Sequence, residues 1–308
     1  MLKFTVIIPV YKSTKSLEVI AQQFKELQKE QAYQFEIIFV NDSPFALATV
    51  RTLENLKSVN SNIEVYSLRK NQGQHIATLV GMSKATGDYV ITMDDDLQHP
   101  VKEIPKLIKA ITSDANLDGV FGIPNYSERK HSLWRSIASY ILKKIDLVFL
   151  HKPKGLVLSS FRIMTKPLAN TVIASYNAMP AISSLMVNAT SSLKNVKIEH
   201  NSREFGKTNY TFLKLFNLAL NSILYYSSLP LKFLGFIGFF VFLLSILFIV
   251  FIFFQKLFNG IEFPGYASTV SLISFFGGLN LFALGLIGEY LIRVIREQQK
   301  PQLEDLIK

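Results

Sequence analysis

The sequence predicts an α/β fold built on a doubly wound, mostly parallel β-sheet, followed by amphipathic interfacial helices and two transmembrane helices. Residues 1 to about 125 alternate short apolar runs with segments that carry apolar residues at helical spacing, which is typical of a parallel sheet covered by helices. Two long uncharged apolar runs follow near the C-terminus. With 308 residues, 49% of them hydrophobic, the chain can form one sizeable core and these additional elements.

The apolar runs of the N-terminal part are rich in β-branched and aromatic residues and nearly continuous, as expected of strands buried on both faces. They predict strands at residues 4–10, 35–40, 63–68, 89–93 and 119–123. The segments between them predict helices at residues 14–31, 45–56, 74–85 and 101–113.

Polar side chains follow four of these strands. Ligands of parallel sheets bind at the carboxyl ends of the strands, so four polar loops at one edge predict a binding site. The residues in question are Tyr11, Asn41 and Asp42, Arg69 and Lys70, and the run from Asp94 to Gln98.

The uncharged runs at 233–255 and 263–288 each have the length needed to cross a bilayer. The alternative, a pair of buried core helices, would need more surrounding protein than the rest of the chain offers. Lysines and arginines flank the pair on both outer sides, whereas the connecting loop offers Lys256 against Glu262. The positive-inside rule therefore predicts a multi-pass protein of the cytoplasmic (inner) membrane with its large N-terminal part and its C-terminus in the cytoplasm.

The middle of the chain mixes basic and apolar residues. Segments 131–150 and 209–228 have apolar residues at helical spacing. Each is either an ordinary core helix or a helix lying in the membrane interface, and the second runs directly into the first apolar run. We therefore expect an α/β domain at 1–165, a membrane-proximal region at 166–230, a transmembrane hairpin at 231–292 and a cytoplasmic tail at 293–308.

The net charge of +10 would suit nucleic acid, a membrane surface or a phosphorylated substrate. We expect the last two as partners and no nucleic acid. The chain has no cysteine, which excludes disulfides and thiolate metal sites. Its start lacks a cleavage site for a signal peptide and is interpreted as mature protein.

Three consecutive carboxylates, Asp94, Asp95 and Asp96, follow the strand expected at 89–93. Because like charges at a strand end repel one another, a hard divalent cation such as Mg²⁺ or Mn²⁺ is the usual counter-charge, and it shares its oxygen ligands with phosphates. In an extended segment Asp94 and Asp96 would point to the same side, with Gln98 next in register and Asp95 opposed. The alternative is a solvated acidic loop.

Several motifs together resemble family 2 glycosyltransferases. These are PVYK, VNDS, LRKNQGQHIATLVGMSKATGDYVITMDDDLQHP, SSFRIM and REFGKTNY, in this order and spacing. More narrowly, the chain is similar over nearly its whole length to the polyprenyl-phosphate glycosyltransferases, such as dolichol-phosphate mannose synthase and bacterial enzymes that glycosylate undecaprenyl phosphate. The resemblance implies a GT-A-like sheet and transfer of a sugar from a nucleotide sugar, a UDP-sugar by preference, to a polyprenyl phosphate that supplies cell-envelope glycan modification. It implies that residues 1–165 are the nucleotide-sugar-binding catalytic domain and that residues 166–230 lie on the acceptor side.

Carried over by motif, the resemblance assigns roles to residues on the donor side. Pro9 and Tyr11 would line the nucleotide pocket, and Asp42 would accept a hydrogen bond from the base. The three aspartates would form the D-x-D region, in which Asp94 supports the nucleotide or the metal. The proposed metal ligands are Asp94, Asp96 and Gln98, and Asp95 belongs with the cofactor-binding residues.

Basic residues complete the expected site. Arg135 and Ser139 match positions that contact phosphate in relatives, and Arg162 matches the arginine of the F-R motif. Asp96, Arg135 and Arg162 are the expected catalytic residues. Arg203 and Lys207 suit a loop that closes on phosphate. Outside the family context each of these residues also has an ordinary interpretation as a turn, packing or interfacial residue.

The chain departs from the family pattern at several positions. Lys12 and Ser13 replace an Asn-Glu pair, Asn41 replaces the first acid of D-D-G-S, and Ser160 stands where relatives often have an aspartate. A lipid monophosphate is already largely anionic at neutral pH, so the attack on the anomeric carbon needs no general base and would invert the configuration. These departures leave the sugar and the nucleotide open.

Two other functions stay open at this point. A processive polysaccharide synthase would call for a Q-x-x-R-W signature, but the single tryptophan, Trp134, lies in SLWRS. A catalytically silent membrane scaffold would fit the missing acids but not the intact Asp94, Asp96 and Gln98. The resemblance also allows a homo-oligomer assembled through the membrane-proximal helices.

Overall fold

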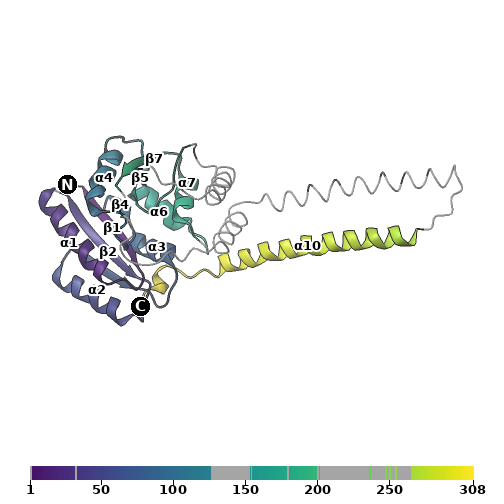
Figure 1. The fold of residues 1–308 in the computed structure, drawn as a ribbon, viewed down its shortest axis with the longest axis horizontal. Coiled ribbons are helices and arrows are strands. Elements are labelled where there is room, and N and C mark those ends of the chain that lie inside the picture. Colours follow the sequence, from purple (N-terminus) through teal and green to yellow (C-terminus); the bar gives the residue numbers. More distant parts are fainter. Residues whose placement is uncertain are drawn as a thin grey trace. The chain divides into compact units, whose positions relative to one another are not determined.

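The computed structural model describes residues 2–31, 33–125, 153, 155–178, 180–199, 201 and 265–308, together with the isolated positions 236, 240, 247, 250 and 254. The chain forms two compact units. The first comprises Met1–Asn209 and Lys300–Lys308, and the second comprises Tyr210–Gln299. Figure 1 gives the order of the elements along the chain.

The first unit is built on a seven-stranded sheet in the order β3-β2-β1-β4-β6-β5-β7. Only β6 runs antiparallel to its neighbours, so the predicted mostly parallel sheet is confirmed. The strands are β1 (Lys3–Val10), β2 (Gln34–Asn41), β3 (Ile63–Ser67), β4 (Tyr89–Thr92), β5 (Gly119–Pro124), β6 (Arg162–Thr165) and β7 (Leu193–Ile198).

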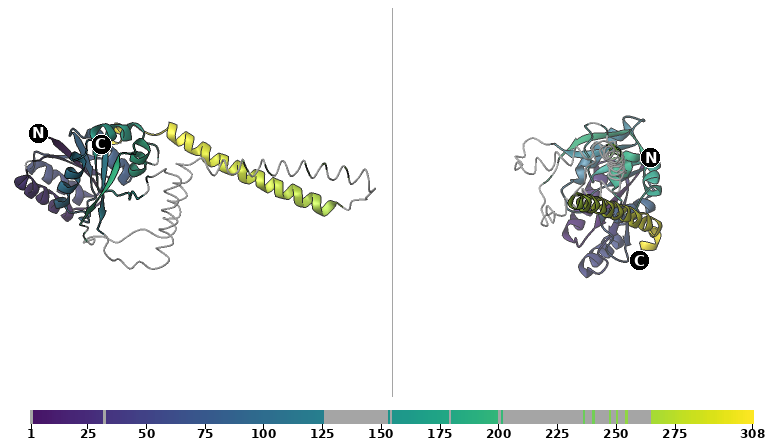
Figure 2. Two further views of the ribbon diagram at one scale, coloured as in Figure 1. Left: turned by 90° about the horizontal axis from the view of Figure 1, so that it is seen from above. Right: turned by 90° about the vertical axis from the view of Figure 1, so that its right-hand side faces the viewer.

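Helices cover both faces of this sheet (Figure 2). One face carries α1 (Lys15–Glu30), α2 (Leu47–Val59), the 3₁₀ turn η1 (Val101–Glu103) and α4 (Ile104–Thr112). The other carries α3 (Gln74–Lys84), α6 (Lys166–Ala174), α7 (Ile182–Ala189) and the 3₁₀ turn η2 (Glu304–Leu306).

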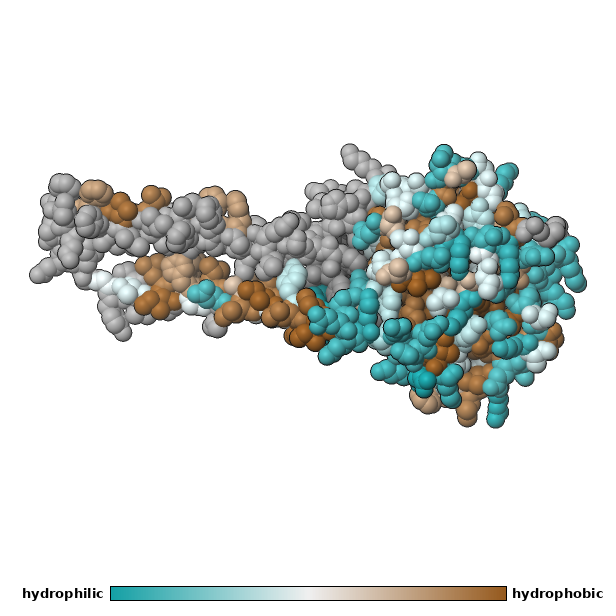
Figure 3. All heavy atoms as spheres, turned by 180° about the vertical axis from the view of Figure 1, so that it is seen from behind, coloured by the Kyte–Doolittle hydropathy of each residue, from teal (hydrophilic) through white to brown (hydrophobic). Residues whose placement is uncertain are grey.

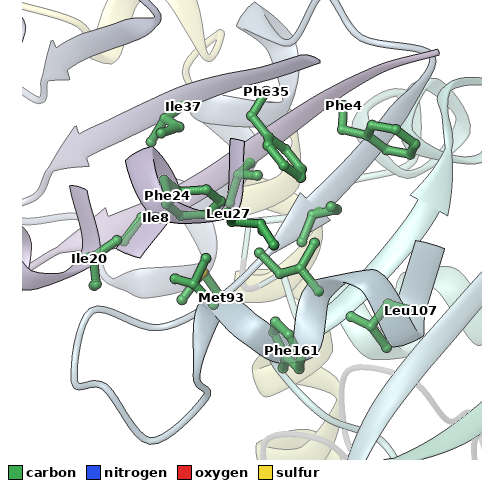
Figure 4. Close-up of a cluster of buried hydrophobic side chains, with 14 of the residues drawn as sticks. Phe4, Ile8, Ile20, Phe24, Leu27, Phe35, Ile37, Met93, Leu107 and Phe161 are labelled. Atoms are coloured by element: carbon green, nitrogen blue, oxygen red, sulfur yellow. The ribbon is translucent and has the colours of Figure 1, made fainter. Parts of the chain in front are cut away.

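Alternation along the strands divides the core into two clusters. Phe4 and Ile8 of β1 pack in one cluster with Phe24 and Leu27 of α1, as Figure 4 shows. Ile7, between them, points to the other cluster. Because both faces are buried, every position of the central strand after Lys3 is apolar or small, which explains the continuous run in the sequence.

The five strands and four helices predicted in the first 125 residues are all present, with boundaries shifted by a few residues and the last helix beginning as η1. The strand β6 was not predicted. It has four residues, and its first, Arg162, is a buried charge, so neither length nor composition signals a strand. It pairs with β4 and β5 and separates them in the sheet.

The second unit contains α10 (Tyr266–Gln298), a helix of 33 residues. Its segment Phe275–Gln298 has a mean hydropathy of 1.6, and among the described residues it is the one helix long and apolar enough to cross a membrane. Figure 3 shows mostly hydrophobic spheres along this helix. The predicted span at 263–288 falls largely on α10.

The predicted span at 233–255 lies outside the described residues except for five helical positions. The transmembrane hairpin and its orientation therefore stay predictions. The segments 131–150 and 209–228, expected to be amphipathic helices, also lie outside the described part. The residues predicted as the tail at 293–308 are shared between the end of α10 and the first unit.

Candidate active site

The carboxyl ends of the parallel strands bring four of the predicted loops to one edge of the sheet. β1 ends before Tyr11, β2 before Asp42, β3 before Arg69 and β4 before Asp94. The in-register pairing of β1 with both β2 and β4 explains why these loops meet although they are far apart in sequence.

The N-terminus of α3 joins two of the predicted acids. The carboxylate of Asp42 accepts the backbone N–H groups of Gln72 and Gly73 at 2.6 and 2.9 Å, and the side-chain amide of Gln74 donates to Asp94 at 2.5 Å. Gly73 has a φ of +89°, a conformation that side chains with a β-carbon rarely adopt. One short segment thus anchors Asp42 on one side and Asp94 on the other.

Asp94 is held through both of its oxygens. Gln74 donates to Oδ1, and the hydroxyl of Ser160 donates to Oδ2 at 2.7 Å. Ser160 stands where the family resemblance led us to expect an aspartate, and its hydroxyl faces the Asp94 carboxylate as a donor. Charged acceptors make stronger hydrogen bonds than neutral ones, and Asp94 is therefore well oriented.

Arg162 lies beneath this carboxylate, 2% exposed. Its Nε donates to Thr92 Oγ1 at 2.9 Å and its Nη1 to Ser183 Oγ at 2.6 Å. Burial lowers the pKa of Arg162 to about 10, and the charge of Asp94 opposes that effect. The guanidinium is therefore a buried cation at neutral pH, and its charge attracts the Asp94 carboxylate.

His75 lies next to Gln74 on α3 and is exposed. Desolvation and the charge of Arg162 lower the pKa of His75 to about 4. The ring is therefore neutral at physiological pH. It does not add a second positive charge beside Arg162.

Asp95 faces the loop after β1. Burial raises its pKa to about 6; hydrogen bonds from Ser13 and from the Tyr11 amide, the latter at 3.3 Å, oppose this, and the charges of Asp94 and Asp96 add to it. Burial is the main cause of this shift, and the two neighbouring carboxylates act in the same direction, so a cation nearby would be favourable.

The segment after β4 turns instead of continuing as a strand, which corrects the expected alternation of side chains. Leu97 has a φ of +61° and its side chain is buried in the core. Asp96 Oδ1 accepts the Gln98 backbone N–H at 3.2 Å, as in an Asx turn. Burying Leu97 forces this turn, so Asp96 and Gln98 are neighbours through local geometry and not through strand register.

The donor set suits a hard cation. Within the described ranges no group of three or more His, Cys, Asp or Glu side chains could hold a metal by itself. The carboxylate of Asp96 and the side-chain oxygen of Gln98 are both partly exposed hard ligands, and a cation bound there would need further oxygens, as phosphates provide. The Gln98 carbonyl accepts the backbone N–H of Asn201 at 3.0 Å.

The remaining predicted donor-side residues differ in exposure. Tyr11 is 53% exposed, and Lys12 Nζ lies 5.1 Å from the centre of its ring. Pro9 is buried in β1. Asp42 is 3% exposed; burial raises its pKa, against the two amide hydrogen bonds. Arg135, Ser139, Arg203 and Lys207 lie outside the described residues.

Comparison with known proteins identifies the family. Residues 5–172, more than half of the chain, match the family model described as glycosyl transferase family 2. The chain belongs to this family. The match covers β1 to β6, and with them the acidic loop and Arg162.

Relatives of this family 2 glycosyltransferase match it almost end to end. A Bacillus subtilis protein named as a glycosyltransferase, CsbB, is 30% identical over 300 residues, which is 96% of this chain and 88% of that protein. An undecaprenyl-phosphate 4-deoxy-4-formamido-L-arabinose transferase of Pectobacterium carotovorum is 29% identical over 94% of this chain and 88% of its own. The enzyme of Photorhabdus laumondii with the same name is 26% identical over 96% and 90%. The predicted polyprenyl-phosphate type is consistent with these names.

Solved structures share the fold of the glycosyltransferase. Mannosyl-3-phosphoglycerate synthase from Rubrobacter xylanophilus has a TM-score of 0.53 at 13% identity, covering 76% of this chain and 75% of its own. Glucosyl-3-phosphoglycerate synthase from Mycobacterium tuberculosis, in complex with Mn²⁺, UDP-glucose and phosphoglyceric acid, has a TM-score of 0.51 at 12% identity, covering 72% and 78%. The predicted GT-A-like sheet is confirmed by this likeness.

The structure of the glycosyltransferase adds site residues that the sequence did not single out. Gln74, Thr92 and Ser183 contact Asp94 or Arg162 through their side chains. Gln74 stands inside the motif NQGQH, so its motif was visible but its partner was not. Ser183 belongs to none of the sequence motifs, and it reaches Arg162 because α7 packs there.

Proposed function

We propose that this family 2 glycosyltransferase transfers a sugar from a nucleotide sugar, expected to be a UDP-sugar, to undecaprenyl phosphate or a similar polyprenyl phosphate at the cytoplasmic membrane face. One observation carries the proposal. Relatives named as undecaprenyl-phosphate sugar transferases match 94 to 96% of the chain, so the similarity extends beyond the sheet unit into the second unit. The lipid-linked sugar would supply cell-envelope glycan modification.

The donor diphosphate would bind at the acidic loop with Mg²⁺ or Mn²⁺. Asp96 and Gln98 would ligate the cation, with Asp94 behind them, and Tyr11 would contact the nucleotide. The bound cation would neutralise charge that develops on the departing diphosphate. The structurally similar Mycobacterium tuberculosis enzyme, which binds Mn²⁺ and UDP-glucose, supports this donor site by analogy of fold.

In the reaction, an oxygen of the lipid phosphate attacks the anomeric carbon while the bond from that carbon to the diphosphate oxygen breaks. A single displacement of this kind inverts the anomeric configuration. Arg135, Ser139, Arg203 and Lys207 would bind the phosphates. Positive charge held near the two anionic groups lowers the barrier electrostatically.

The hydrogen bond between Ser160 and Asp94 fits an acceptor that needs no general base. The Ser160 hydroxyl is committed to Asp94, and the second proton of a lipid monophosphate is already largely lost at neutral pH. A sugar hydroxyl as acceptor would need a base to take its proton. The chemistry of this site therefore favours phosphate over hydroxyl as the nucleophile.

A transfer assay tests the proposal. Membranes containing the protein are incubated with labelled nucleotide sugars, Mg²⁺ and undecaprenyl phosphate, and are then extracted with organic solvent. We expect the label in an acid-labile glycolipid, and label in polymer would instead indicate a polysaccharide synthase. Nucleotide binding without turnover for any donor would indicate a silent scaffold.

The variant Asp96→Asn should lose nearly all transfer while still inserting into the membrane, because the amide is a weaker ligand for a hard cation. Asp114→Asn is the matched control, since Asp114 lies before β5 at the opposite edge of the sheet and caps a turn there. Full activity of Asp96→Asn would refute its role as a metal ligand.

A further inference from the structure

The residues after α10 return to the first unit and cover its sheet edge. We propose that residues 300–308 act as a strap that fixes the loop at residues 68–73 and thereby sets the affinity of the donor nucleotide site; this second part rests on the proposed function. Figure 1 shows the C-terminus among the elements of the sheet unit.

Backbone hydrogen bonds tie the strap to the end of β3. The Arg69 N–H donates to the Leu306 carbonyl at 2.8 Å, and the Lys308 N–H donates to the Ser67 carbonyl at 2.8 Å. Leu68 and Ile307 form an antiparallel bridge. Because β3 is the outermost strand on its side of the sheet, the strap covers an edge that would otherwise present unpaired backbone groups.

Side chains hold the strap along its length. Leu303 and Leu306 are 6% and 8% exposed and belong to the core cluster that contains Leu68. At its start, the hydroxyl of Tyr176 donates to the Pro301 carbonyl at 2.5 Å, and Lys300 Nζ donates to the Tyr176 carbonyl at 2.6 Å. This burial makes the segment an integral part of the unit and not a loose tail.

The loop that the strap contacts is the one that holds Asp42. Arg69 Nε donates to the Asp305 carbonyl at 2.9 Å. Three residues further on, the Gln72 and Gly73 amides donate to the buried Asp42 carboxylate. Residues 69–73 have no regular secondary structure, so their position depends on these two sets of contacts. A contact chain therefore runs from Leu306 through Arg69 to Asp42, at the strand end where the nucleotide is proposed to bind.

The strap follows α10 directly in the chain, because α10 ends at Gln298 and the strap begins at Lys300, and it holds the loop only by non-covalent contacts. The ion pair between Lys84 and Glu304 adds little, since the Glu304 side chain is 75% exposed. The buried leucines and the backbone bonds are thus the parts to test.

Hydrogen exchange on the full-length protein in detergent micelles tests the strap directly. In Leu306→Ser we expect the Arg69, Gln72 and Gly73 amides to exchange about tenfold faster or more, because a buried leucine contributes most of the local stability. The amides of β1 and β2 should keep their protection. Leu47→Ser is the matched control, since Leu47 is 69% exposed on α2, and it should leave all of these amides unchanged.

The second measurement is equilibrium binding of UDP, GDP and CDP with Mn²⁺ to the same proteins. For whichever diphosphate binds the wild-type chain best, we expect Leu306→Ser to weaken binding about tenfold if the loop opens to that extent. If none binds to the wild-type chain, the proposed function fails and with it the strap's role in donor binding, while the exchange data still decide whether the strap fixes the loop.

Two results would overturn the proposal. One is unchanged exchange of residues 69–73 in Leu306→Ser; the other is faster loop exchange with unchanged nucleotide affinity. If Leu306→Ser unfolds the whole unit, the milder Leu303→Ala is used instead. Uniform loss of protection in that variant too would make the segment part of the global core, which contradicts a local strap.

Discussion

At the scale of single residues, Asp94 is the acid of the candidate site that the surrounding side chains hold most firmly. Both oxygens of Asp94 accept hydrogen bonds, from Gln74 and Ser160, and the buried charge of Arg162 lies nearby. An acid in place of Ser160 would face Asp94 as a like charge. The serine instead donates a hydrogen bond that orients Asp94.

Replacing Ser160 by alanine should lower turnover about tenfold, because a hydrogen bond to a charged acceptor is lost. Ser160→Thr keeps the hydroxyl and should restore most of the activity. Steady-state transfer kinetics measure both variants, and equal melting temperatures would show that the fold is intact. Ser58→Ala, at the exposed end of α2, is the control. Equal activity of the alanine and threonine variants would contradict the positioning role of Ser160.

Glu36 gives a pH-dependent prediction at the same scale. Burial alone would raise its pKa, but hydrogen bonds from Thr5 and Thr86 and the charge of Lys3 outweigh burial and lower the pKa below its ordinary value. A carboxylate with a depressed folded-state pKa stabilises the fold above the unfolded-state pKa and loses that contribution as pH falls. The stabilisation by Glu36 should therefore disappear as pH falls below about 4.5.

Thermal unfolding followed by circular dichroism between pH 7 and pH 3 checks this expectation. The variant Glu36→Gln should melt below wild type at pH 7, and the difference should shrink as the medium becomes acidic, because the glutamine does not titrate. Glu54→Gln, which changes an exposed carboxylate, serves as the control. A pH-independent difference for Glu36→Gln would rule out the depressed pKa as the cause.

At the scale of elements, α3 is the piece that joins the core to the site. Its N-terminal segment binds Asp42 and Asp94, while its middle packs on the central strands. Gly81 makes this close packing possible. A β-carbon there would collide with the Ile7 side chain of β1 and approach that of Val40 to 3.1 Å.

Gly81→Ala should destabilise the protein by about 1–3 kcal/mol, the usual effect of overpacking a core. Because the shift would move α3 away from the sheet, donor binding should weaken as well. Thermal unfolding and nucleotide binding measure the two effects. Ser83→Ala, also on α3, is the control, because it changes a partly buried position without adding volume. Gly155→Ala would not serve, since Gly155 has a φ of +84°. Wild-type stability of Gly81→Ala would disprove the close approach.

The strand β6 shows how an element can carry a site residue without a signal of its own. Its pairing with β4 places Arg162 opposite Thr92, at the base of the acidic loop. This four-residue strand lies between β4 and β5 and forms because they bury it, so tertiary context decides its structure.

At the scale of the whole molecule, the membrane topology is the main remaining prediction. Since the chain has no cysteine, a single introduced cysteine reports one position. In spheroplasts, an impermeant maleimide should label Asn259→Cys in the expected outer loop, and should label Lys57→Cys on α2 only after permeabilisation. The positive residues that flank the two apolar runs are the reason for this orientation. Labelling of Lys57→Cys in intact spheroplasts would reverse it.

The sequence by itself determined five of the seven strands, β1 to β5, and the parallel direction that these five share, and it predicts the edge on which the candidate site lies. Continuous apolar runs such as 4–10 and 35–40 indicate strands that are buried on both faces, and the polar residues that follow each run mark the carboxyl end of its strand. The family motifs predicted the roles of the acids, because Asp42 lies in VNDS and Asp94 and Asp96 lie in YVITMDDDLQHP.

Only the tertiary structure decided how these residues are held. The turn at Leu97, the contact of Ser160 with Asp94, the burial of Arg162 and the strap formed by residues 300–308 all depend on partners that are distant in sequence or on packing that no local pattern encodes. Local propensity and periodicity report what one segment prefers. The hydrogen bond between Ser160 and Asp94, which are 66 residues apart, forms because the sheet brings the two residues together. Such a contact depends on the packing of the whole unit and not on any local segment.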